Sequence, residues 1–136
     1  METKALNYLS LARKGGMAEL GEEPVGAVSR TGKAYVVLVA SDASDHTWRR
    51  AKSFVAGTDQ QCIRLDVTKD EMGFAIGRTS LAIAAITDVQ LALALVKSLV
   101  KPEPQALEVL SAKAEKAKKR RSEAKAHQRN LRKGKK

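Results

Sequence analysis

The chain has little of several residue types, and each shortage excludes a kind of site. A single cysteine, Cys62, excludes an intramolecular disulfide framework and a zinc site built from cysteines. Two histidines, His46 and His127, are too few for a histidine metal cluster. Aromatic residues make up only 4% of the chain, which argues against a surface on which many bases stack. We therefore expect neither a metal nor a cofactor.

Catalytic motifs are also missing from the sequence. It has no GxxxxGK or GxGxxG pattern for phosphates, and Gly73 and Gly77 stand at the wrong spacing for either. There is no GxSxG nucleophile elbow. His46 has no evident nucleophile partner and is interpreted as a surface residue. Cys62 lies in an apolar run, which favours an inert core residue. We expect a protein that is not an enzyme.

Long apolar runs and targeting signals are missing as well. Residues 1–13 contain charges and Asn7 where a signal peptide needs an apolar stretch. The best candidate for a membrane span, residues 81–100, is interrupted by Asp88 and Lys97. Together with the single cysteine, this favours a cytoplasmic protein.

What the chain has is positive charge, and it is unevenly distributed. The 25 Lys and Arg against 15 Asp and Glu give a net charge of +10, and 43% hydrophobic residues suffice for a core. Residues 1–100 hold 12 basic and 11 acidic residues, whereas residues 101–136 hold 13 and 4. This predicts a near-neutral domain over 1–100 and a basic tail over 101–136 that is helix-prone or disordered. The tail suits a polyanion, nucleic acid before an anionic membrane surface, and a solvated solubility tail is the alternative.

Apolar periodicity predicts an α/β fold. Apolar runs indicate strands over residues 17–20, 34–40, 62–66 and 81–86. Helical patterns cover residues 3–14, 22–31, 45–56, 68–76 and 87–100. The alternation predicts a three-layer α/β/α sandwich with a largely parallel mixed sheet.

Turn and cap residues place the element ends. Capping boxes are predicted at Thr68–Glu71 and at Thr87–Gln90. Pro102 and Pro104 mark the end of the domain. Trp48 could stack on an unpaired base, but its place on an apolar helix face favours packing.

An ordered set of short segments resembles a known family. The segments share glycines and apolar runs at matching places and are 6–9, 15–16, 21–23, 32–34, 37–44, 71–78 and 84–88. Over about residues 4–98 the chain resembles ribosomal proteins of the L-seven-Ae and L-thirty-e type, and more closely their bacterial ribosomal-protein-like members. The resemblance implies a three-layer α/β/α fold, RNA binding within a ribonucleoprotein and, in many members, recognition of kink-turns.

The resemblance also implies a first RNA-contacting loop at Gly21. There the family has an Asn-Glu pair followed three residues later by a lysine, whereas this chain has Glu23, Pro24 and Ala27. A carboxylate at Glu22 or Glu23 would accept hydrogen bonds from base amino groups. Of the family's kink-turn-binding residues in this loop, the chain therefore keeps only the glycine, Gly21.

The resemblance implies a second RNA-contacting loop, residues 77–82, before the last strand. It also implies that basic residues near the loops contribute phosphate contacts. Arg78 would contact phosphate or stack, while its neighbours would hydrogen-bond to a splayed RNA loop. We expect Arg13, Lys14 and Lys33 to flank the same end of the fold. The full predicted RNA-binding set is Arg13, Lys14, Gly21, Glu22, Glu23, Lys33, Arg78, Thr79, Ser80, Leu81, Ala82, Lys118, Lys119, Arg120 and Arg121.

These observations favour a non-catalytic RNA-binding protein, ribosomal or ribosome-associated. Its expected partners are ribosomal or other structured RNA and ribosomal or other ribonucleoprotein proteins, with no membrane. The alternative is a protein-interaction module on the same fold whose tail alone tethers it to RNA. The fold also resembles an RNA-recognition domain of some ribosomal RNA methyltransferases, but no cofactor-binding catalytic domain fits in 136 residues.

Overall fold

The computed structural model describes residues 2–133, with side chains through residue 128. In this part of the chain the elements are, in order, α1 (Thr3–Lys14), β1 (Ala18–Leu20), α2 (Glu22–Arg30), β2 (Val36–Val39), α3 (Asp45–Val55), β3 (Gln61–Arg64), α4 (Lys69–Ala75), β4 (Ile83–Ile86), α5 (Val89–Lys97) and α6 (Pro104–Lys133). Each strand and helix expected from the sequence is present, with shorter strands than predicted.

The four strands form one mixed sheet in the order β1-β4-β2-β3. Only β2 and β3 are parallel, whereas β4 runs antiparallel to both β1 and β2. A mixed sheet is thus confirmed, but the prediction that it is largely parallel is wrong. The connection from β3 to β4 runs through the short helix α4, which lies at the end of the sheet where β3 finishes. The chain therefore enters β4 at that end, and β4 runs back antiparallel to β2.

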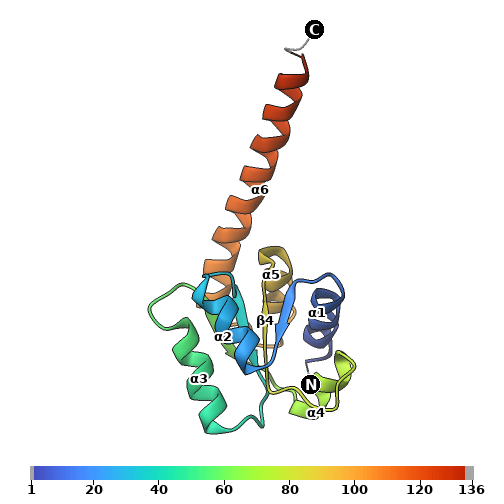
Figure 1. Ribbon diagram of the computed structural model, residues 1–136, viewed down its shortest axis with the longest axis vertical. Coiled ribbons are helices and arrows are strands. Elements are labelled where there is room, and N and C mark those ends of the chain that lie inside the picture. The colour runs from blue at the N-terminus through green and yellow to red at the C-terminus, as the bar shows by residue number, and fades with distance from the viewer. Residues whose placement is uncertain (1, 134–136) are drawn as a thin grey trace.

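Helices cover both faces of the sheet. In Figure 1, α2 and α3 lie on one side of β4, and α1 and α5 lie on the other. Every residue of β2 and of β4 is buried, as expected for strands covered on both faces.

The strand directions define two ends of the sheet, which are used as names below. At the Gly21 end β1 finishes and β4 begins, since Leu20 pairs with Ala84. At the Lys33 end β1 and β2 begin and β4 finishes, since Val36 pairs with Ile86. In Figure 1 the Gly21 end is at the bottom and the Lys33 end at the top.

One of the two predicted capping boxes is confirmed and the other is displaced. The Ser44 hydroxyl accepts a hydrogen bond from the Thr47 amide, and Thr68 with Glu71 forms a complete capping box. At α5 the cap is Asp88, whose carboxylate accepts from the Leu91 amide at 2.9 Å. The box predicted at Thr87 is wrong by one residue, because the Thr87 amide instead donates to the Met17 carbonyl beside the sheet.

The basic segment is one helix, α6, that begins on the body and leaves it. Ala106, Leu110 and Ala114 are buried against the core. Every side chain from residue 118 to residue 128 is exposed. Figure 1 shows this outer part projecting from the Lys33 end. Within residues 2–133, no helix combines the length and apolar character that crossing a bilayer requires.

Candidate nucleic-acid interface

The two loops implied by the sequence meet at the Gly21 end. The Gly21 amide donates to the Ile83 carbonyl at 3.0 Å, which joins the start of α2 to the start of β4. Gly21 has φ +95°, a region that L side chains rarely adopt, so the turn between β1 and α2 requires glycine. The Gly21 loop and residues 77–82 therefore form one rim, which α6 does not cover (Figure 1).

Loop 77–82 is fixed to α4 by backbone hydrogen bonds. The Arg78 amide donates to the Gly73 carbonyl at 2.8 Å, and the Leu81 amide donates to the Lys69 carbonyl at 3.0 Å. The side chains of Arg78, Thr79 and Ser80 are exposed, as a contact surface requires. The Leu81 side chain is 4% exposed and belongs to the core, while Ala82 is half-buried.

Gly73 allows loop 77–82 to pass close to α4, a role that no local sequence pattern indicates. A Cβ atom at Gly73 would lie 2.5 Å from the Ser80 nitrogen and 2.6 Å from its Cα atom. These are backbone atoms, so a side chain at this position would push the whole loop outward. Gly73 thus sets the position of Arg78 and Ser80.

The start of α2 carries carboxylates, one of them paired. Glu22 forms a salt bridge with Arg50 of α3, and both side chains are partly exposed. Arg50 also lies over the Phe54 ring, 5.4 Å from its centroid. Glu23 is exposed, and Pro24 and Ala27 beside it are exposed too. Arg50 was not among the predicted residues, because no local spacing links α3 to the start of α2.

Phe74 is a second residue that sequence reasoning missed. Its side chain is 87% exposed, the most exposed of the large hydrophobic residues described. It lies in α4 immediately before loop 77–82, and its carbonyl accepts from the Gly77 amide. An exposed ring four residues before Arg78 suits stacking on an unpaired base. Its helix pattern contained the signal, since Met72 and Gly73 are the buried positions of α4.

The expectation that Arg13, Lys14 and Lys33 flank the same end as Arg78 is wrong. Arg13 and Lys14 close α1 just before β1 begins, and Lys33 precedes β2, so all three lie at the Lys33 end. The reason is the direction of the strands: β1 runs from this end toward Gly21. Lys118, Lys119, Arg120 and Arg121 lie on α6 beyond the same end.

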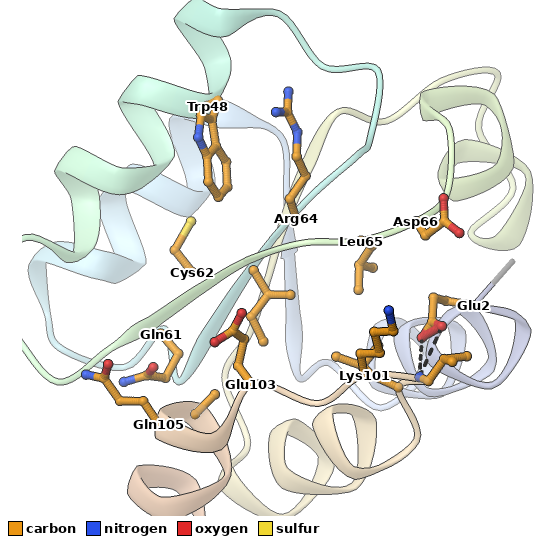
Figure 2. A pocket seen from close by; sticks show the side chains of 14 residues that line it. Glu2, Trp48, Gln61, Cys62, Arg64, Leu65, Asp66, Lys101, Glu103 and Gln105 are labelled. Atoms are coloured by element: carbon orange, nitrogen blue, oxygen red, sulfur yellow. Dashed lines mark hydrogen bonds between the residues drawn. The ribbon is translucent and has the colours of Figure 1, made fainter.

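A groove of about 840 Å³ lies elsewhere, along the edge strand β3 (Figure 2). Trp48 of α3 stands on one side and the segment leading into α6 on the other, where the Glu2 carboxylate accepts from the Val100 amide. Trp48 packs against the core, and the guanidinium of Arg64 and the ammonium of Lys52 lie 5.2 and 5.3 Å from its ring centroids. The packing interpretation of Trp48 is thus confirmed. None of the predicted RNA-binding residues lines this groove.

The groove holds no recognisable catalytic group. Burial raises the pKa of the Cys62 thiol to about 11, which keeps it protonated and unreactive at neutral pH. His46 is exposed at the start of α3. Over the described residues, no three His, Cys, Asp or Glu side chains cluster closely enough to hold a metal ion.

Among known proteins, no family model matches the chain. It is 37% identical over 62 residues to the RNA-binding protein YlxQ of Enterococcus faecium, a match that covers 46% of this chain and 60% of that protein.

Solved structures share the fold. A Bacillus halodurans protein of unknown function superposes with a TM-score of 0.65 at 23% identity, over 70% of this chain and 95% of the other. The 15.5kD RNA binding protein of Giardia lamblia gives a TM-score of 0.58 at 16% identity, over 79% and 82% of the two chains. The solved structures thus share the fold, and the partial sequence match is to an RNA-binding protein, in line with the resemblance that the sequence indicated.

Proposed function

We propose that this chain is a non-catalytic RNA-binding protein, ribosomal or ribosome-associated, that binds structured RNA at the Gly21 end. The observation that carries the proposal is the hydrogen bond from the Gly21 amide to the Ile83 carbonyl, which places two separate loops on one open rim. The named functions of the Enterococcus faecium and Giardia lamblia relatives support RNA binding. The expected partner is a kink-turn or a similarly bent RNA in the cytoplasm.

The rim offers three kinds of contact. The exposed Arg78 guanidinium suits a phosphate or a guanine edge. Thr79 and Ser80 present hydroxyl groups to a splayed loop, and the exposed Phe74 ring offers a stacking face. Glu23 accepts hydrogen bonds from base amino groups. Arg50 brings a cation to the start of α2, where the family's lysine is replaced by Ala27.

Two substitutions in the full chain test the rim. Arg78→Ala should weaken binding of a kink-turn hairpin by about 1–3 kcal/mol if the guanidinium reads a base edge. Phe74→Ala should cost about 1–3 kcal/mol if the ring stacks on a base, while Phe74→Tyr should restore binding. The matched control is Leu11→Ala, because Leu11 is also exposed and apolar but lies on α1 near the Lys33 end.

One observation favours the alternative of a protein-binding rim. Glu22 is engaged by Arg50, and the carboxylate of Glu23 stands exposed beside it, so the start of α2 repels phosphate. If neither Arg78→Ala nor Phe74→Ala changes hairpin affinity, and RNA binding depends only on the α6 cations, the rim binds protein and the proposal is wrong.

A further inference from the structure

The body is electrically polarised from one end to the other. Four exposed cations gather at the Lys33 end, where Arg13 and Lys14 close α1, Arg30 closes α2 and Lys33 follows. The Gly21 end carries most of the body's acidic side chains near the strand ends and helix starts, namely Glu22, Glu23, Asp42, Asp45, Asp66 and Asp70. Phosphate is therefore attracted most strongly at the end away from the proposed rim.

The base of α6 is fastened at the Lys33 end. The Lys113 ammonium donates to the Asp59 carboxylate at 2.7 Å and lies 5.4 Å from the centroid of the Tyr35 ring. One residue later, the Gln90 side-chain amide donates to the Ala114 carbonyl at 3.1 Å. These contacts come from the segments before β2 and β3 and from α5, and they fix the direction in which α6 leaves the body.

Beyond this anchor α6 is a projecting cationic rod. Residues 118–128 hold five Lys and Arg against one Glu, and all their side chains are exposed. At 1.5 Å per residue this stretch is about 16 Å long. Because the helix is continuous from Pro104 to Lys133, residues 118–128 extend away from the Gly21 end and do not return to it (Figure 1).

We propose that the protein holds two RNA segments at once, a structured RNA at the Gly21 end and a second, duplex segment at the Lys33 end. The inference rests on the proposed function for the first segment. The second is held by α6 together with Arg13, Lys14, Arg30 and Lys33. These are contacts to phosphate, so this end binds RNA with little choice of sequence. The protein then joins two helical segments of one folded RNA or of two RNAs.

The test uses the full chain and two short probes. The first is a biotinylated kink-turn hairpin on beads, and the second is a fluorescent RNA duplex of about eight base pairs, too short to reach both ends. Wild-type protein should retain the duplex on the beads, and native mass spectrometry should show one protein with two RNAs.

Replacing Lys118, Lys119, Arg120 and Arg121 by Gln preserves helix propensity. This variant should lose duplex retention by about tenfold or more and keep the hairpin. Lys4→Gln with Lys97→Gln is the control for lost charge elsewhere.

The outcomes separate the two proposals. If wild-type protein binds only one RNA at a time, and the α6 variant and Arg78→Ala both weaken the same RNA, the two-segment inference is wrong while the rim is retained. If the α6 variant loses all RNA and Arg78→Ala changes nothing, both proposals are wrong. Duplex retention that survives the α6 substitutions also refutes the inference.

Discussion

Gly73→Ala should displace loop 77–82 without replacing any residue that is proposed to contact RNA. The added Cβ atom would lie 2.5 Å from the Ser80 nitrogen, 2.6 Å from its Cα and 2.9 Å from its carbonyl carbon. Ordinary carbon contacts in protein interiors are about 3.5 Å or longer, so the loop must retreat by about 1 Å. That movement would stretch the Arg78 amide to Gly73 carbonyl hydrogen bond, now 2.8 Å.

Two opposing contributions decide the effect on stability. Alanine is favoured over glycine inside a helix by about 1 kcal/mol. Overpacking against backbone costs about 1–3 kcal/mol, and the stretched hydrogen bond adds about 1 kcal/mol. The free energy of unfolding should therefore fall by about 1–3 kcal/mol. Binding sites need their groups held within about 0.5 Å, so affinity for a kink-turn hairpin should fall more than stability alone explains.

Denaturant unfolding and hairpin binding, measured on the same preparations, check this prediction. Gly15→Ala is the matched control, because its Cβ would approach the flexible end of Met17 at 2.7 Å, while the nearest backbone atom, the Leu11 carbonyl oxygen, would lie at an ordinary 3.5 Å. That variant should be nearly as stable as wild type and bind the hairpin normally. If Gly73→Ala is at least as stable as wild type and the amide chemical shifts of Arg78 and Ser80 do not change, the argument from close packing is refuted.

Three further predictions concern α6 and the thiol. Leu110→Ala should lower the free energy of unfolding by about 2–5 kcal/mol, because Leu110 is fully buried, whereas Lys119→Ala should change it by less than about 0.5 kcal/mol. The hydrogen bond from Lys113 lowers the pKa of Asp59 below its ordinary 3.8, so the pair stabilises the fold above that pH and this contribution disappears as pH falls through the lowered pKa. Asp59→Asn should thus be slightly less stable than wild type at neutral pH, and urea unfolding at about pH 2 should show no difference. Alkylation of Cys62 in the folded protein should keep accelerating with pH up to about 11, whereas in the urea-unfolded chain it should level off near 9.0, and a plateau near 9.0 in the folded protein would contradict its burial.

The positions of the elements could be predicted from sequence because each depends on local patterns. The apolar run before Ser41 predicts a strand with both faces buried, and β2 is such a strand. The capping box at Thr68 and Glu71 is local too. The direction of β4 is not local, since it depends on where α4 packs, and α4 lies at the end of the sheet where β3 finishes.

The rim was predicted only in part, because its residues can be marked in the sequence but the contacts between them cannot. The resemblance marked Gly21 and Arg78 but held no information on the hydrogen bond that joins their loops. Gly73 matters because of what lies above it in space, which its neighbours in sequence do not reveal. Phe74 was passed over because a low aromatic content argues against a platform of many rings, although one exposed ring suffices for one base.

The distribution of charge over the body is the clearest feature that the sequence alone does not predict. Residues 1–100 hold 12 basic and 11 acidic residues, and a sum so close to neutral does not reveal where on the body the charges lie. The fold separates those charges, with Arg13 and Lys33 at one end and Glu23 and Asp42 at the other. Because α6 leaves from the basic end, its charge adds to that end instead of offsetting the carboxylates at the rim. A protein that gripped one RNA at the rim would gain more from cations beside Glu23, so this polarity favours a second RNA segment at the Lys33 end.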